Sequence, residues 1–272
     1  MIPLLGLGGL AMEKKTNKTK QSSHIQSVEK AILILDILSK KNEGMSLTQI
    51  SQKLKYPKST VHGILATLRD YKFVEQFEET GNYKLGTRLF ELGNKVARSW
   101  DIRDAAIPIM KKLNKQFGET VHLGAEDNGD MLYLEKIDAN HLINISSEVG
   151  VRLPMHCSGL GKVLLAQKSP AELKRFINQK GLPALTRRTI TTQSALEKEL
   201  EKIRKQGYAI DDGEIMEGLR CVAAPIKDAN GIVRYAISIS AQVRDLYGTR
   251  LNQVIQETVR AANQISKELK NL

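Results

Sequence analysis

Residues 46–85 decide the fold of the N-terminal part of the chain, and they read SLTQISQKLKYPKSTVHGILATLRDYKFVEQFEETGNYKL. Three apolar residues recur there at the spacing of one helix face: Leu47, Ile50 and Leu54. Ser46 precedes them and Gln49 follows it by three positions, which is the spacing of a capping box. Pro57 suits the first turn of a helix but not its interior. The pattern therefore predicts a short helix, a tight turn and a longer helix over residues 58–71.

The longer helix is predicted to have one apolar face and one polar face. At about 100° per residue, the buried stripe falls on Val61, Ile64, Leu65 and Leu68. The opposite face then carries mostly short side chains, from Ser59, His62, Gly63, Ala66 and Thr67. Such a face is suited to the major groove of DNA.

Two short strands are predicted after this helix, over residues 73–77 and 83–85, and residues 78–82 between them are typical of a turn. Upstream, a helix with Ser27 as N-cap is predicted from Val28, Ala31, Ile32, Leu35 and Leu38. Three helices and a hairpin wing within about 60 residues indicate a winged helix-turn-helix. The alternative is a small helical domain without a ligand.

The charge of the chain is concentrated near its N-terminus. Of the net charge of +11 over 272 residues, +7 lies in residues 1–100. An excess of this size indicates an anionic partner, either nucleic acid or an acidic membrane surface, unless it only keeps the protein soluble. Cys157 and Cys221 are the two cysteines, which excludes a disulfide scaffold and indicates a reducing compartment.

Residues 1–24 are predicted to be a disordered basic extension. The apolar run from Met1 to Met12 is shorter than the roughly 20 residues that span a bilayer. Its lysines follow the apolar run, whereas a secretory signal carries them before it. Whether translation starts at Met1 or at Met12 stays open. We therefore expect a cytoplasmic protein.

Beyond the wing, residues 87–117 are predicted to form two helices. Leu89, Leu92, Val96 and Trp100 share one face, and Pro108 is expected to interrupt the helical stretch. The result is a linker helix near 87–100 and another helix near 104–117. Because an apolar stripe on a linker helix needs a partner, dimerisation is the natural candidate.

The remaining residues alternate between strand and helix patterns, which indicates an α/β (α+β) domain around an antiparallel sheet. Strands are predicted over residues 120–126, 131–138, 142–146, 208–210, 221–227 and 232–240. Helices are predicted over residues 159–167, from 170, over 194–206 and over 246–270. Asp127-Asn128-Gly129-Asp130 is a hairpin turn between the first two strands.

The sequence lacks the motifs of nucleotide binding, nucleophilic catalysis and metal binding. Gly159-Leu160-Gly161-Lys162 is too short for a nucleotide-binding loop, although its backbone could hold a small anion or simply need glycine for close packing. His156 and Cys157 adjoin it, but neighbours in sequence do not establish a nucleophile and its base. Possible metal donors have no diagnostic spacing, so we expect neither a metal, nor another cofactor, nor a catalytic residue.

The strongest constellation of polar residues lies in the C-terminal part. Asp211 precedes Cys221, and Ser238 and Ser240 lie two apart on one predicted strand, so that both point to the same side. Two hydroxyls on an apolar strand cost desolvation unless they find partners. Either they satisfy nearby backbone groups or they line a polar pocket suited to a small carboxylate or polar aromatic compound.

From about Ser27 to Lys270, the sequence resembles the IclR family of bacterial transcriptional regulators. The resemblance rests on residues 27–31 (SVEKA), 57–62 (PKSTVH) and 159–166 (GLGKVLLA), and above all on Gly207-x-x-x-Asp211-x-x-Glu214 followed by 221–226 (CVAAPI). It implies a winged helix-turn-helix, a linker helix and a GAF-like effector domain, assembled as a homodimer or homotetramer. By position, the effector pocket of the family corresponds to Gly159, Leu160, Asp211, Cys221, Ser238 and Ser240.

Three residues depart from the pattern of the family. Gly63 stands where the family often has arginine, so the operator sequence cannot be carried over. Lys227 stands where an aromatic residue is more frequent. Leu160 is bulkier than the small residue common in the pocket, and a larger side chain reshapes the cavity. The identity of the effector therefore stays open.

We thus expect a DNA-binding regulator whose operator affinity depends on an organic acid or aromatic metabolite. We expect it to be a repressor rather than an activator. Its expected domains are residues 25–86 for DNA, 87–103 as linker and dimerisation helix, and 104–272 for effector binding and oligomerisation. The residues expected at the DNA are Lys58, Ser59, Thr60, His62 and Thr67, with Lys84 of the wing at a phosphate. Two alternatives remain: a small-molecule enzyme that uses Cys221 and carries a DNA-binding appendage, and a structural DNA-binding protein without an effector.

Overall fold

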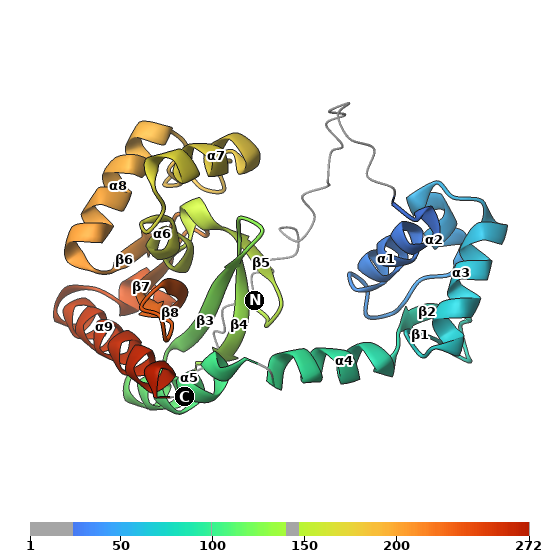
Figure 1. The fold of residues 1–272 in the computed structure, drawn as a ribbon, viewed down its shortest axis with the longest axis horizontal. Helices are drawn as coiled ribbons and strands as arrows, with labels where there is room; N and C mark the ends of the chain where they lie inside the picture. The colour runs from blue at the N-terminus through green and yellow to red at the C-terminus, as the bar shows by residue number, and fades with distance from the viewer. Residues whose placement is uncertain (1–23, 99, 140–146, 272) are drawn as a thin grey trace. The chain divides into compact units, whose positions relative to one another are not determined.

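The computed structural model describes residues 24–98, 100–139 and 147–271, which form two compact units separated in sequence near residue 99 (Figure 1). Residues 1–23 of the predicted extension and the strand predicted over residues 142–146 lie outside the described residues. Within the described ranges, no helix combines the length and the apolar character needed to cross a membrane.

The first unit contains the predicted winged helix-turn-helix. Its elements are α1 (Gln26–Leu38), α2 (Leu47–Leu54), α3 (Lys58–Asp70), β1 (Val74–Gln76), β2 (Tyr83–Leu85) and α4 (Thr87–Arg98). Strands β1 and β2 pair antiparallel, with Glu75 opposite Lys84. Met45 and Tyr83 exchange backbone hydrogen bonds of 2.9 and 2.8 Å, which ties the α1–α2 connection to the wing. A core with Ile34, Ile50, Val61 and Leu65 at its centre holds the three helices together.

Helix α1 corrects two predictions. It begins at Gln26 after Ile25, so Ser27 lies inside the helix and is not its N-cap. The predicted core residues Val28 and Ile32 are 52% and 53% exposed, whereas Ile34, Ile37 and Leu38 are buried. Residues 31–35 are apolar around the whole helix, and periodicity alone cannot fix which side of such a helix faces the core.

The capping box of α2 is confirmed. The Gln49 N–H donates to Ser46 Oγ at 3.3 Å, and the Ser46 N–H donates to Gln49 Oε1 at 2.9 Å. We expect Ser46→Ala to lower the free energy of unfolding of this unit by about 1 kcal/mol, because the N-terminus of α2 loses its side-chain acceptor. Urea unfolding followed by circular dichroism measures the loss. Ser27→Ala is the matched control, with an expected change below about 0.5 kcal/mol at its exposed position, and equal losses in the two variants would contradict this account.

Helices α4 and α5 (Asp101–Phe117) correspond to the helices predicted near 87–100 and 104–117. The predicted break at Pro108 is wrong, because Pro108 lies inside α5 and the break precedes Asp101. Pro108 and Asp104 are both exposed. The proline therefore lies on the solvent side of α5, and the helix continues through it without the hydrogen bond that an N–H at this position would donate to the Asp104 carbonyl.

The second unit is built on a six-stranded antiparallel sheet of order β5-β4-β3-β8-β7-β6. Its strands are β3 (Thr120–Asp127), β4 (Asp130–Ile137), β5 (Arg152–Pro154), β6 (Ala209–Asp212), β7 (Leu219–Lys227) and β8 (Val233–Gln242). Its remaining helices are α6 (Gly159–Leu165), α7 (Pro170–Lys180), α8 (Gln193–Gln206) and α9 (Gly248–Lys270), with short 3-10 turns at η2 (Met155–Cys157) and η3 (Val243–Asp245). The α/β (α+β) class predicted from the sequence is confirmed.

Helices cover both faces of this sheet (Figure 1). On one face, α5 and α9 pack against alternate sheet residues such as Val121, Val222 and Ile239. On the other, α6, α7 and α8 form a second core that includes Ala223 and Ala236. The predicted turn between β3 and β4 has Asn128 and Gly129 at φ 53° and 78°, the backbone that a two-residue hairpin requires.

Candidate functional site

The polar face predicted for the recognition helix lies on the surface of the first unit. Lys58, Ser59, His62 and Thr67 on α3 are exposed, and Thr60 is half-buried beside the core residue Val61. Gly63 is also exposed. The predicted polar face of α3 is therefore accessible from solvent.

Two of the predicted DNA-contacting groups already have partners within the protein. Thr67 Oγ1 donates to the Gly63 carbonyl at 3.0 Å, as a threonine in a helix interior often does. Lys84 Nζ lies 3.4 Å from Glu75 Oε2 and 4.6 Å from the centre of the Phe77 ring. A phosphate contact by Lys84 therefore competes with the bonds inside the wing.

Five polar residues gather on the sheet face that α6 covers, and we call them the polar patch: His122, Asp211, Cys221, Ser238 and Ser240. Asp211 pairs with Cys221 in the register of β6 and β7, and Cys221 pairs with Ser240 in that of β7 and β8. Ser238 pairs with His122 across β8 and β3. Paired residues and residues two apart share a face, so the four predicted members lie beside one another.

The first turn of α6 covers this patch. A methyl group added at Gly159 would lie 3.3 Å from Cβ of Ala223 and 3.7 Å from Cβ of Cys221. Leu160 Cδ1 would lie 3.2 Å from a methyl group at Gly124 of β3. The structure therefore brings all six residues predicted for the effector site to one interface between α6 and the sheet.

Asp211 is the buried acid of the patch. Its Oδ1 accepts from the Glu214 N–H at 2.7 Å, while its Oδ2 is buried without a hydrogen-bond partner among the described residues. Burial raises the pKa of Asp211 to about 7, although the Glu214 N–H favours the charged form. The folded protein thus keeps a proton that the unfolded chain loses near pH 4, and the stability linked to it declines as pH rises through about 7.

Lys162 lies one turn further along α6 and is fully buried. Its ammonium group donates to the Ile210 carbonyl at 2.7 Å and to Glu214, and lies 3.7 Å from Glu199. Burial raises the pKa of Glu214, and the Lys162 ammonium opposes this shift. The sequence left open whether this helix start holds a small anion on its backbone or needs glycine for close packing. A methyl group at Gly161 would overlap the backbone of Met155, which agrees with close packing, and the lysine side chain forms an internal ion pair.

Sequence reasoning missed the part of His122 and Tyr133 in this site. The rings of His122 and Tyr133 stack with centroids 4.5 Å apart. His122 Nε2 lies 2.7 Å from Ser147 Oγ, and Nδ1 lies 3.4 Å from Ser240 Oγ. Burial lowers the pKa of His122 to about 3, so the ring is neutral at physiological pH. Only the register of β3 against β8, which the sequence does not show, brings His122 beside Ser240.

The two thiols have the electrostatics of structural cysteines. Burial raises the pKa of Cys157 to about 12 and also raises that of Cys221, with nearby Asp211 adding to both shifts. A nucleophilic cysteine needs a lowered pKa instead. In the described ranges, no group of three or more histidine, cysteine, aspartate and glutamate side chains is placed to hold a metal ion.

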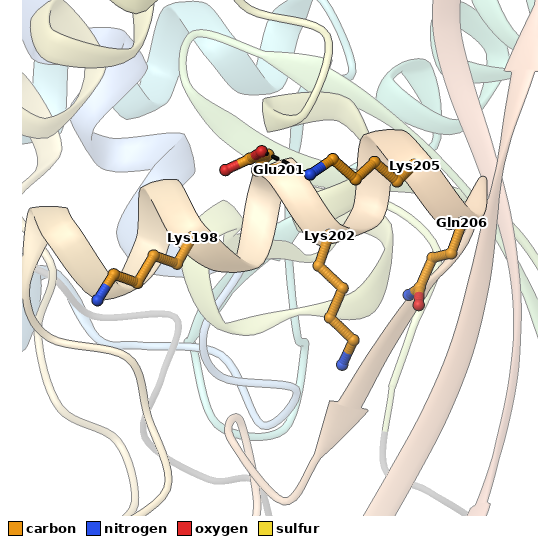
Figure 2. A pocket seen from close by; sticks show the side chains of 5 residues that line it. All are labelled: Lys198, Glu201, Lys202, Lys205 and Gln206. Atoms are coloured by element: carbon orange, nitrogen blue, oxygen red, sulfur yellow. Dashed lines mark hydrogen bonds and ion pairs between the residues drawn. The ribbon is translucent and has the colours of Figure 1, made fainter.

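A surface hollow on α8 lies apart from the predicted site residues. Figure 2 shows its lining side chains, which all belong to this helix: Lys198, Glu201, Lys202, Lys205 and Gln206. Lys205 donates to Glu201 at 2.7 Å, one turn back along the helix. Because both side chains are mostly exposed, this is an ordinary solvated ion pair and not a candidate site.

Comparisons with known proteins cover nearly the whole chain. Residues 27–77 match the family model described as the IclR helix-turn-helix domain, and residues 94–267 match that of the bacterial transcriptional regulator IclR C-terminal. The chain is 32% identical over 247 residues to the transcriptional repressor IclR of Escherichia coli K12, and the match covers 90% of each chain.

Solved structures show the same fold. The crystal structure of Thermotoga maritima IclR matches with a TM-score of 0.76 and 32% identity, over 91% of this chain and 100% of that one. An IclR homologue from Microbacterium hydrocarbonoxydans, crystallised with 4-hydroxybenzoate, matches with a TM-score of 0.80 over 90% of this chain and 100% of that one. At 23% identity this second likeness concerns the fold alone.

Proposed function

Because the chain belongs to the IclR family of bacterial transcriptional regulators, we propose that it represses transcription until a small effector binds its C-terminal unit. Regulation of transcription through a DNA-binding unit and an effector-binding unit is common to the family. The finer assignments of residues, effector class and assembly are our proposals. The polar patch, buried against α6, is the observation that most supports an effector site in the C-terminal unit.

The DNA-binding surface is proposed to be the exposed face of α3, with Lys58, Ser59, Thr60, His62 and Thr67, and with Lys84 of the wing at a phosphate. Base-edge contacts by the short side chains specify sequence, while the lysines mainly add affinity that depends on salt. We assign residues 25–86 to this role and place its action at the chromosome, in the cytoplasm.

We expect His62→Ala and Ser59→Ala each to weaken operator binding about tenfold, because each removes a polar group from the face that enters the groove. Fluorescence anisotropy with an operator found by genomic footprinting measures this. His24→Ala and Ser27→Ala are matched controls, since both residues are exposed and lie outside α3. An unchanged affinity in both α3 variants would place the recognition surface elsewhere.

The effector is proposed to be a small organic acid or aromatic compound held between α6 and the polar patch. Gly159 and Leu160 shape one wall, while Asp211, Cys221, Ser238 and Ser240 supply polar groups on the other. A ligand changes DNA affinity only if it favours one arrangement of the protein over another. Release of the footprinted operator by one compound class tests this. A screen in which no acid or aromatic compound alters DNA binding would favour a structural DNA-binding protein.

We propose no catalytic role for Cys221, and no cofactor. Its raised pKa leaves little thiolate at neutral pH, which argues against the alternative of an enzyme with a DNA-binding appendage. Turnover of a bound compound that Cys221→Ala abolishes would restore that alternative.

A homodimer or homotetramer is proposed, with residues 87–103 as the pairing helix and residues 104–272 contributing to assembly. Phe90 on α4 is 74% exposed, and an apolar side chain this open on a linker helix is suited to a contact with a second copy of the chain. Sedimentation of the full chain distinguishes the two assemblies.

A further inference from the structure

Gly63 lies on the exposed face of α3, and the fold does not require a glycine at this position. Its backbone is helical, and no heavy atom of the described residues, apart from its chain neighbours and the backbone of its own helix, lies within 4 Å of a methyl group placed there. At Gly161, by contrast, the same methyl group would overlap the backbone of Met155. Glycine weakens a helix interior relative to alanine, because it loses more backbone entropy on folding. Position 63 therefore carries a cost in stability that neither packing nor backbone geometry explains.

The missing side chain leaves a shallow depression in the exposed face of α3. The residues three and four positions away on a helix border such a point, and here they include Ser59 before Gly63 and Ala66 and Thr67 after it. Ser59 and Thr67 are exposed, and Ala66 is half-buried. Because all three side chains are short, a small group of a partner can approach the backbone of the helix at Gly63.

Thr67 does not offer its hydroxyl proton to a partner. The hydroxyl donates to the Gly63 carbonyl at 3.0 Å, one turn back along α3. A base acceptor would have to break this bond to receive the proton. Without breaking it, the exposed Thr67 side chain offers a methyl group and an oxygen that only accepts.

The face around the depression also lacks the side chains that read purines by paired hydrogen bonds. Arginine and lysine form such pairs with guanine, and asparagine and glutamine form them with adenine. The sequence between Lys58 and Arg69 contains none of these four residue types. A face of short, partly apolar side chains is instead suited to the C5 methyl group of thymine, which is the apolar group that this base presents in the major groove.

We propose that the depression at Gly63 receives the C5 methyl group of a thymine in the operator, and that Ala66 and Thr67 contact the same methyl group. The inference rests on the proposed DNA-binding function of α3 and adds the base chemistry that this face selects. Gly63 permits the close approach, Thr67 supplies an apolar contact, and Ser59 and His62 form hydrogen bonds to neighbouring bases. The protein therefore discriminates against uracil, which lacks only the methyl group.

Uracil in place of thymine tests this inference directly, because the two bases differ by the methyl group alone. Each thymine of the footprinted operator is replaced in turn, and fluorescence anisotropy gives the dissociation constant of the full chain. At one or more of these positions we expect binding to weaken about fourfold, as the burial of one methyl group predicts. Thymines outside the footprint are the controls on the DNA, and their replacement is expected to change nothing.

Variants of the protein show whether the depression causes the difference. Gly63→Ala fills the depression, and we expect it to bind the thymine operator no more tightly than the uracil operator, although the folded protein gains stability. Thr67→Ser removes the methyl group and keeps the hydroxyl, which is expected to reduce the fourfold ratio of the two dissociation constants to below about twofold. Thr67→Val keeps the methyl group and loses the hydroxyl, so that the ratio is retained whatever the change in affinity.

Thr249→Ser is the matched control, because it removes the same methyl group at an exposed position of the other unit and is expected to keep the full ratio. A ratio that disappears in both Gly63→Ala and Thr67→Ser supports the inference. A ratio that persists in either variant comes from the shape of the DNA and overturns it. Equal binding of all uracil operators also overturns it, and both of these outcomes leave operator binding by α3 standing. Unchanged affinity in His62→Ala and Ser59→Ala contradicts the proposed surface and the inference together.

Discussion

Replacing Lys162 by methionine is expected to lower the free energy of unfolding of the effector unit by about 3–5 kcal/mol. The side chain is fully buried, and its ammonium group is the partner of Glu214 and of the Ile210 carbonyl. Methionine has a similar length but leaves that carboxylate and carbonyl buried without their donor. Thermal and urea unfolding of the full chain, followed by Trp100 fluorescence, report on this unit because Trp100 packs against its core.

Two further variants show whether the loss comes from the ion pair. Lys202→Met removes a lysine of α8 whose side chain is 64% exposed, and its expected effect is below about 0.5 kcal/mol. Adding Glu214→Leu to Lys162→Met removes the stranded charge and is expected to recover about 2 kcal/mol or more. If the double variant is as unstable as the two single changes added together, the loss reflects packing and not the buried charge.

Replacing Gly161 by alanine is expected to destabilise the same unit by about 3 kcal/mol. A methyl group at this position would overlap the backbone of Met155 in η2, which cannot rotate away as a side chain does. The helix start would have to shift, and with it Gly159 and Leu160 above the polar patch. We therefore expect loss of effector binding together with the loss of stability, both measurable by thermal shift with and without an acid.

Gly63→Ala is the matched control because it makes the same change in a helix with open space. Apart from its chain neighbours and the backbone of its own helix, no heavy atom of the described residues lies within 4 Å of the added methyl group. We therefore expect a gain of about 0.5–1 kcal/mol from the lower backbone entropy of the unfolded chain. A similar loss of stability at both glycines would mean that the contact with Met155 does not explain the need for glycine at position 161.

Local signals in the sequence were sufficient for much of the fold. The capping box at Ser46 and Gln49, the hairpin turn at Asn128-Gly129 and the helix start at Ser169-Pro170 depend on residues within four positions of one another. Each was predicted, and the structure confirms each. The errors arose where a pattern allows more than one answer, as for the apolar circumference of α1 and for Pro108 on the solvent side of α5.

The part of the candidate site that could be predicted also consists of residues close to one another in the sequence. Asp211 and Cys221 lie on neighbouring strands of one hairpin-like pair, and the motif that contains them places them together. His122 and Ser240 are 118 positions apart in the chain and meet because β3 pairs with β8. The sequence also could not show which groups bind the Lys162 ammonium. The Ile210 carbonyl and Glu214 follow Lys162 by 48 and 52 positions, beyond α8.

The alternation along β7 and β8 has a consequence for how the protein matures. Cys221, Ser238 and Ser240 face α6, while Val222 and Ile239 between them face α5 and α9. A slip of one residue would turn the hydroxyls into the apolar core and the valine and isoleucine toward the patch. The groups proposed to bind the effector thus come together only in the correctly registered sheet, and an effector bound to them would stabilise that register alone. An effector present during synthesis is expected to raise the yield of correctly folded regulator, so that the metabolite influences both the activity and the amount of the protein that senses it.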